Sequence, residues 1–220
     1  MAALGALLGG AALLLAAPKV AEAPAIVARF AQRHHEIPVL HPGHRFTEAL
    51  IATEDHRFDA PYDIGVDPVA LLRVILSAIV PNGRDGGGSS IDQQLAKMLF
   101  TPGQSGQLAA DLKQVVLAVD LHFAYSRPAI LRMYAAMAYF GSGYYGVESA
   151  SEGYFGHPSA ELTWAQAAML AGLANAPSAD DPRTHPAQAA ARRAHVFARL
   201  VAVGDLTPEQ AAQAGRAPLL

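Results

Sequence analysis

Glu54 is the residue of this sequence best suited to acid–base chemistry. It ends the amphipathic run TEALIATED and is followed by Asp55, His56, Arg57 and Phe58. A carboxylate at the edge of a core helix, close to an aromatic ring, can lose enough water to act as a general base. The other interpretation is an ordinary Glu-Asp pair at a solvated helix end, which is the commoner situation on residue chemistry alone.

A second candidate is the stretch from Gly86 to Lys97, which reads GGGSSIDQQLAK. Glycines let backbone N–H groups approach an anion, serine and glutamine side chains can bind sugar hydroxyls or phosphate oxygens, and Lys97 adds positive charge. Gly83 and Gly88 have P-loop spacing, but Ser89 stands where the essential lysine belongs, which excludes a nucleotide-binding loop. The stretch is not a G-x-S-x-G nucleophile elbow either. The alternative is a surface loop followed by a capped helix.

A third candidate is the segment that contains Asp111, Lys113, Gln114 and Asp120. Asp111 and Gln114 are three residues apart and therefore share one face of the expected helix. The aromatic and glycine-rich residues that follow could form a sugar-binding wall, although tyrosines at such spacing more often fill a core or an interface.

The elements that must position these residues are short helices. Their start signals are capping residues and prolines, and apolar residues recur with a helical period between them. The expected helices begin near Pro68, Gln107, Ser126, Thr163, Thr184 and Thr207, and they end near Pro81, Tyr125, Gly141, Ala174 and Gly204. No β-strand alternation persists long enough to propose a major sheet. We therefore expect a mainly α fold.

The composition fits one well-packed domain. The chain has 220 residues, of which 52% are hydrophobic and 16% charged, so disorder is not expected. The net charge of -3 argues against a nucleic-acid partner. The absence of cysteine excludes disulfides and thiolate metal sites. None of the nine histidines has H-E-x-x-H spacing, so we expect scattered surface histidines and assign no metal ligand.

The first seventeen residues carry no charge, and Pro18-Lys19 closes the run. As a helix this run would reach about 26 Å, close to the roughly 30 Å hydrocarbon core of a bilayer. The alternatives are a cleaved signal peptide with A-E-A at residues 21–23, and a buried core helix. We expect an uncleaved transmembrane anchor at residues 1–18, a linker or neck at 19–44 and one domain at 45–220.

Taken in order, the segments of this chain resemble the peptidoglycan glycosyltransferases of glycosyltransferase family 51. That family includes monofunctional transglycosylases and the transglycosylase domains of penicillin-binding proteins. Any one motif would be a weak signal, but the ordered set is specific, and it runs from Phe46 to Arg199. The matching segments are EDHRF, GVDPVALLR, GGSSIDQQLAK, YSRPAILRMYAAMAYFGSGYYGVESAS, LTWAQAAMLAGLANAPS and RRAHVF. No transpeptidase segment is expected after them.

The resemblance implies a lysozyme-like helical fold and the polymerisation of lipid II at the outer face of the bacterial cytoplasmic membrane. It implies that Glu54 is the general base, a role that typically contributes about 10²–10⁴ in rate. The base removes the proton from the acceptor's 4-hydroxyl, which attacks the donor's anomeric carbon while undecaprenyl diphosphate leaves. The implied partners are lipid II, nascent glycan strands, the membrane and other cell-wall synthesis proteins, with no nucleic acid.

The resemblance also implies a set of site residues, with Glu54 and Gln114 at the catalytic positions. Substrate binding falls to Asp55, Phe58, Ser89, Gln93, Gln94, Lys97 and Lys113. A magnesium or manganese ion often assists the family near the diphosphate, where negative charge grows in the transition state.

The chain departs from the family pattern at four places. Gln114 stands where the third motif has a catalytic glutamate, and Ala110 and Asp111 replace an arginine and a lysine. The first-motif histidine is replaced around Pro61-Tyr62, with two residues inserted before Gly65. Met98 and Ala136 replace two asparagines.

These departures leave more than one function open. The first is an active glycan polymerase. The second is a catalytically impaired homologue that binds lipid II or glycan as an envelope scaffold, which the loss of charge near Gln114 favours. The third is a glycan-cleaving enzyme with Glu54 as general acid.

Overall fold

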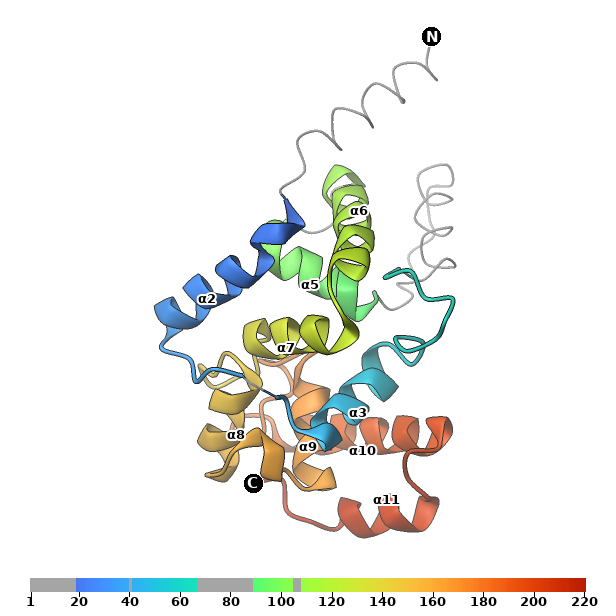
Figure 1. The fold of residues 1–220 in the computed structure, drawn as a ribbon. Helices are drawn as coiled ribbons and strands as arrows, with labels where there is room; N and C mark the ends of the chain where they lie inside the picture. The colour runs from blue at the N-terminus through green and yellow to red at the C-terminus, as the bar shows by residue number, and fades with distance from the viewer. Residues whose placement is uncertain (1–18, 40, 67–88, 105–107) are drawn as a thin grey trace.

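The computed structural model describes residues 19–39, 41–66, 89–104 and 108–220 of the chain (Figure 1). Three expectations lie outside the described residues: the membrane anchor at 1–18, the helix that begins near Pro68, and the glycines at 86–88. The expected helix start near Gln107 lies outside them as well.

The described residues form helices and no strand, which confirms the expectation of a mainly α fold. Tyr139 and Tyr145 form an isolated antiparallel bridge. None of the described helices is both long and apolar enough to cross a membrane. The elements are η1 (Val20–Glu22), α2 (Ala23–His34), α3 (His44–Glu54), α5 (Ile91–Phe100), α6 (Leu108–Ala124), α7 (Arg127–Met137), α8 (Val147–Phe155), η2 (Ser159–Glu161), α9 (Trp164–Leu173), α10 (Pro186–Val203) and α11 (Pro208–Gly215).

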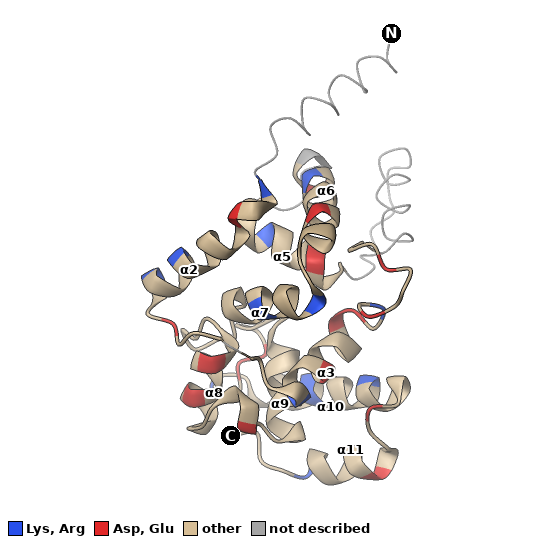
Figure 2. Cartoon of the chain, viewed as in Figure 1, with Lys and Arg blue, Asp and Glu red and all other residues tan. Residues whose placement is uncertain are grey.

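The helices form two packed groups. In one group, α9 packs against α3 and α10; in the other, α5 packs against α6 and α7 (Figure 1). Helix α9 carries no charged residue (Figure 2), and most of its residues are buried. Gly172 allows α10 to approach α9 closely, because a Cβ atom there would lie 2.9 Å from Cγ of Arg192. This close packing brings the Arg192 side chain near the end of α3.

Local hydrogen bonds fix several helix starts. Thr163 with Gln166 and Thr207 with Gln210 form complete capping boxes, which confirms the expected starts of α9 and α11. Helix α7 follows Ser126 as expected, but it ends at Met137 and not near Gly141. The reason is that Ala138 is extended, and the following turn pairs Tyr139 with Tyr145.

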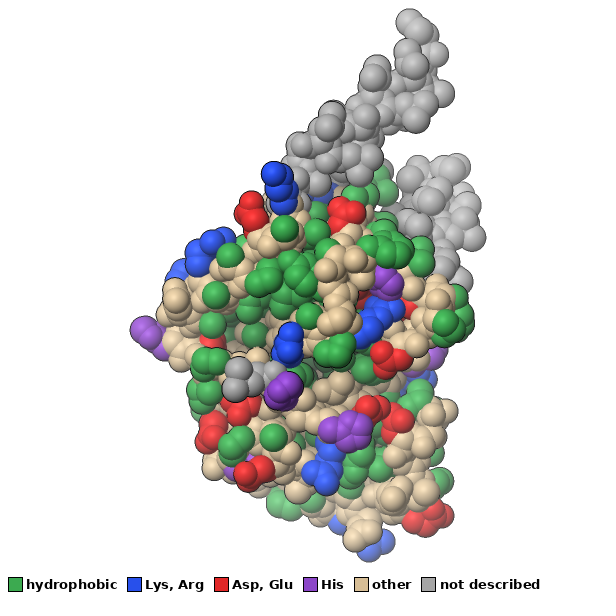
Figure 3. Space-filling view, in the orientation of Figure 1, with side chains coloured by type: hydrophobic (Ala, Val, Ile, Leu, Met, Phe, Trp, Pro, Cys, Tyr) green, Lys and Arg blue, Asp and Glu red, His purple; other side chains and the backbone are tan. Residues whose placement is uncertain are grey.

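The segment expected as a linker or neck contains α2, which packs against α7. Val27 and Phe30 of α2 contact the hydrophobic core, and the Tyr125 hydroxyl donates a 2.8 Å hydrogen bond to the carbonyl of Val20. Hydrophobic side chains gather on the face that carries α2 and α6 (Figure 3). Residues 19–34 are thus in direct contact with the rest of the described domain.

Candidate active site

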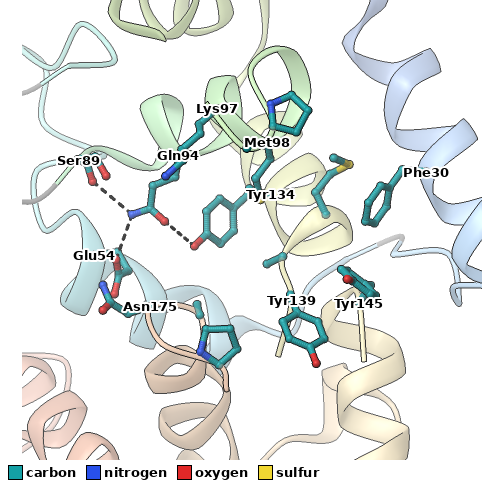
Figure 4. A pocket seen from close by; sticks show the side chains of 16 residues that line it. Phe30, Glu54, Ser89, Gln94, Lys97, Met98, Tyr134, Tyr139, Tyr145 and Asn175 are labelled. Atoms are coloured by element: carbon teal, nitrogen blue, oxygen red, sulfur yellow. Dashed lines mark hydrogen bonds between the residues drawn. The ribbon is translucent and has the colours of Figure 1, made fainter. Parts of the chain in front are cut away.

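A cavity of about 570 Å³ lies between the two helix groups (Figure 4). Its lining comes from α2, α3, α5 and α7, from the aromatic turn after α7, and from the segment that follows α9. Polar atoms gather at one end and aromatic rings at the other (Figure 4). The lining includes Phe30, Glu54, Ser89, Gln94, Lys97, Tyr134, Tyr139, Tyr145 and Asn175.

Glu54 is the last residue of α3, and its side chain is only 6% exposed. Its Oε2 accepts a 3.0 Å hydrogen bond from Nε2 of Gln94, on α5. Its Oε1 lies 3.1 Å from Nη2 of Arg192, on α10, in an ion pair. An opposite charge and a hydrogen bond compensate the loss of water around this carboxylate. The acid is therefore oriented from both helix groups.

Gln94 is the centre of the polar end of the cavity (Figure 4). Its Nε2 also donates to the carbonyl of Ser89 at 3.3 Å, and its Oε1 accepts from the Tyr134 hydroxyl at 2.9 Å. Burial, assisted by the negative charge of Glu54, raises the pKa of Tyr134 well above its usual range. Tyr134 is therefore a permanent donor. It holds the oxygen of the Gln94 amide and leaves the NH₂ group for Glu54.

The start of α5 explains why Gln94 and not Gln93 reaches the cavity. Ser90 accepts from the backbone N–H of Gln93, and the Gln93 side chain accepts from the backbone N–H of Ser90. This capping box occupies Gln93 in the helix end. Lys97 follows Gln94 by three residues, so both lie on the face that lines the cavity.

Asp55 and Phe58 are predicted to bind substrate, but they do not line this cavity. Oδ2 of Asp55 accepts a 3.1 Å hydrogen bond from the N–H of Ile91, which attaches the start of α5 to the end of α3. Burial raises the pKa of Asp55 to about 6, although this hydrogen bond opposes the shift. Phe58 is fully buried, with the Arg127 guanidinium 4.6 Å from its ring centroid. Both residues therefore belong to the packed structure next to the cavity and not to its lining.

Three further predicted residues are also absent from this lining. Gln93 is held in the capping box. Nε2 of Gln114 donates to Oγ1 of Thr101 at 3.0 Å and to the carbonyl of Gln104 at 3.1 Å, so this side chain connects α5 to α6. Lys113 is a half-buried residue of α6. The predicted substrate or catalytic roles of these three side chains therefore remain predictions.

Four predicted residues do come together: Glu54, Ser89, Gln94 and Lys97. Sequence reasoning missed Tyr134 and Asn175, which line the cavity, and Arg192, which pairs with Glu54. Arg192 was visible only as one cation of a basic helix. Tyr134 was visible only as an aromatic residue at helical spacing.

The aromatic end of the cavity contains residues of the stretch that could form a sugar-binding wall. The rings of Tyr139 and Tyr145 have centroids 4.7 Å apart, and Phe30 lies 5.5 Å from Tyr145. Gly141 allows the turn that joins these tyrosines, because its φ is +82° and a Cβ atom would lie 2.6 Å from the carbonyl oxygen of Pro177. Flat apolar rings of this kind suit the faces of sugar rings.

The described lining of the cavity offers one carboxylate, Glu54, and no histidine. Both oxygens of that carboxylate already have partners. A Mg²⁺ or Mn²⁺ ion usually takes several oxygen ligands, so these residues do not form a metal site by themselves.

The chain matches the family model described as "Transglycosylase" over residues 24–201. Penicillin-binding protein 1A of Aquifex aeolicus is 40% identical over 175 residues, covering 78% of this chain and 23% of the relative. Penicillin-binding protein 1F of Bacillus subtilis is 35% identical over 167 residues, covering 76% and 23%. Penicillin-binding protein 1A of Escherichia coli is 36% identical over 163 residues, covering 74% and 19%.

The chain thus spans less than a quarter of the length of these relatives. Among solved structures, the crystal structure of Penicillin-Binding Protein 1A from Haemophilus influenzae overlaps with a TM-score of 0.40 at 26% identity, covering 59% of this chain and 16% of that one.

Proposed function

Because this chain belongs to the transglycosylase family, we propose that it is a peptidoglycan glycosyltransferase that polymerises lipid II into glycan strands. The match to the family extends over residues 24–201, which include every cavity residue named above. The observation that supports the proposal best is the position of Glu54: a nearly buried carboxylate, held by two partners, in a cavity with an aromatic wall.

Glu54 acts as the general base. It accepts the proton of the acceptor sugar's 4-hydroxyl, and the oxygen of that hydroxyl forms a bond to the donor's anomeric carbon. The bond from that carbon to the diphosphate breaks, and undecaprenyl diphosphate leaves with the electron pair, so the configuration inverts. Each carboxylate oxygen can accept two hydrogen bonds. The bonds from Gln94 and Arg192 therefore orient Glu54 and leave acceptor positions for the hydroxyl.

Lys97 supplies positive charge for the leaving group. It is exposed at the rim of the cavity, on the same face of α5 as Gln94. Negative charge grows on the diphosphate as the bond breaks, so a nearby cation favours the transition state. Since the described lining has a single carboxylate, no step of this mechanism depends on a protein-bound metal; Mg²⁺ or Mn²⁺ would have to rely mainly on diphosphate oxygens.

The proposed site of action is the outer face of the bacterial cytoplasmic membrane, with the domain on the periplasmic or extracellular side. Lipid II is itself membrane-bound, and the uncharged segment 1–18 is proposed to tether the chain there. Glycan strands and other cell-wall synthesis proteins are the proposed partners.

A second candidate is an impaired homologue that binds lipid II as a scaffold. Two observations favour it. Gln114, at the position of the family's second catalytic acid, is an amide bonded to Thr101 and Gln104. Glu54 is the only carboxylate in the described lining of the cavity. Glycan cleavage with two carboxylates, the common arrangement in glycosidases, is not supported by this lining.

The deciding experiment gives the purified full chain labelled lipid II with magnesium and follows polymer formation. We expect the wild-type protein to form polymer and Glu54→Gln to reduce the rate at least about 10²-fold, the typical contribution of a general base. Glu48→Gln is the matched control, since Glu48 lies on the same helix but outside the cavity. Lipid II binding without polymer, over several metals and detergents, would support the scaffold.

A further inference from the structure

A second cluster of ionisable groups lies outside the cavity. Asp63 comes from the loop after α3, Asp92 from the first turn of α5, and His122 from the last turn of α6. One ligand atom from each of the three lies within 4.8 Å of the other two. In the sequence, Asp63, Asp92 and His122 lie about thirty residues apart from one to the next, and they share no motif.

Within the described part of the chain, no other residue donates a hydrogen bond to the Asp92 carboxylate. Its side chain is fully buried, and both of its oxygens lack a hydrogen-bond partner among these residues. The nearest nitrogen atoms of basic side chains are Nη1 of Arg127 at 3.7 Å and Nδ1 of His122 at 3.8 Å. Both distances exceed the roughly 2.7–2.9 Å of a charge-assisted hydrogen bond. A buried carboxylate in this state requires a further partner, which can be a proton, a water molecule or a metal ion.

The charges around Asp92 favour a divalent cation. The groups that act on its carboxyl are Arg127, Asp63 and Asp55. Three carboxylates facing one guanidinium leave a net charge of -2 when all are ionised and His122 is neutral.

We propose that Asp63, Asp92 and His122 form a binding site for a divalent metal ion, with Zn²⁺ as the best fit. Two carboxylates and one imidazole are a ligand set that Zn²⁺ accepts, and water can complete the tetrahedron. The imidazole disfavours Mg²⁺ and Ca²⁺, which take oxygen ligands. His122 has a side chain only 13% exposed, so the expectation that the histidines are scattered on the surface is wrong for this residue.

Arg127 is the competitor of the metal. Its Nη2 lies 2.8 Å from Oδ2 of Asp63, and its Nη1 lies 3.0 Å from Nδ1 of His122. Its side chain is 25% exposed, so the guanidinium can withdraw toward solvent. The metal and Arg127 therefore occupy the cluster as alternatives, and removing the arginine should strengthen metal binding.

A metal at this position would stabilise the contacts between the loop after α3, helix α5 and helix α6, next to the candidate active site. Oγ of Ser90 donates a 2.6 Å hydrogen bond to the carbonyl of Gly65, and Oδ1 of Asp63 accepts from the N–H of Gly65 at 3.0 Å. A Cβ atom on Gly65 would lie 2.8 Å from Cβ of His122, so loop, α5 and α6 meet closely here. The same α5 carries Gln94, which holds Glu54.

The test uses the untagged full chain in detergent, freed of metal with a chelator and then dialysed. Calorimetric titration with ZnCl₂ is expected to show one tight site, and saturation is expected to raise the melting temperature. Co²⁺ is expected to give visible absorption bands of a carboxylate–imidazole site. None of these measurements depends on glycan polymerisation, so the result is independent of the proposed function.

Asp92→Asn, which keeps the side-chain volume, is expected to lose the tight site, and so is His122→Gln. Asp120→Asn is the matched control, because Asp120 is an exposed acid on the same helix as His122. Arg127→Gln is expected to tighten Zn²⁺ binding at least tenfold. If the wild-type protein does not bind Zn²⁺, or if Asp92→Asn binds it as tightly as the wild-type protein, the proposal fails, and Asp92 is a protonated or hydrated acid.

Discussion

Replacement of Gln94 by leucine tests the central contact of the candidate active site. The change keeps a side chain of similar size on α5 and removes both the donor to Glu54 and the acceptor for Tyr134. The ion pair between Glu54 and Arg192 remains. The carboxylate is then oriented from α10 alone.

The expected magnitude follows from the two bonds that are lost. A hydrogen bond to a charged group contributes about 1.5–3 kcal/mol, and a buried hydroxyl left without a partner costs about 1–3 kcal/mol. The second cost falls mainly on stability, because Tyr134 is almost fully buried. The first falls on the orientation of the base. Since about 1.4 kcal/mol corresponds to a tenfold change in rate, kcat should fall by about 10- to 10²-fold.

The assay is polymerisation of labelled lipid II by the purified full chain, with melting temperatures measured in the same detergent. Gln114→Leu is the matched control. Gln114 is also a half-buried glutamine with two hydrogen bonds, but both go to the connection between α5 and α6. We expect Gln114→Leu to lower the melting temperature and to leave the kcat of the folded protein nearly unchanged.

The reasoning is refuted by two outcomes. One is a Gln94→Leu protein that is destabilised but keeps wild-type kcat, since Gln94 would then not orient the base. The other is a Gln114→Leu protein that loses as much kcat as Gln94→Leu, since the amide of Gln114 would then act in catalysis despite its contacts with Thr101 and Gln104.

Three further outcomes are expected. Gln114→Glu should lower the melting temperature and not raise polymerisation, because it removes the donor to the carbonyl of Gln104 and places a negative charge beside that oxygen; a gain of activity would restore the expected catalytic role of position 114. Burial raises the pKa of the Asp55 carboxyl to about 6; its contribution to stability is therefore full below about pH 4 and is lost as the pH rises through about 6. Asp55→Asn should remove that part of the slope in a series of denaturant melts, and an unchanged slope would contradict the shift. Deletion of residues 1–18 should move the protein from the membrane fraction to the soluble fraction, whereas soluble periplasmic full-length protein would indicate a cleaved signal.

Features that depend on neighbouring residues could be predicted from the sequence. The capping boxes at Thr163 and Thr207 are hydrogen-bond patterns within four residues, and the position of Glu54 at a helix end follows from the apolar period before it. The S-x-x-Q pattern of Ser90 and Gln93 carried the same signal. It indicates that Gln93 caps the helix and leaves Gln94 for the cavity.

Features that depend on distant residues could not be predicted in this way. Arg192 lies 138 positions from Glu54, and Tyr134 lies 40 positions from Gln94. Periodicity states which face of a helix is apolar, but it does not state which side chain of another helix meets a given polar group. The departure at Gln114 was visible as a missing charge, whereas its hydrogen bonds to Thr101 and Gln104 depend on how the chain passes from α5 to α6.

The two partners of Glu54 belong to different helix groups, since Gln94 is on α5 and Arg192 is on α10. Any motion that widens the space between these groups by more than about 0.5 Å stretches one of these contacts beyond hydrogen-bond length. Glu54 therefore keeps both partners only while the two helix groups stay close together. A small molecule that wedges the groups apart would inhibit polymerisation without resembling a sugar or a diphosphate.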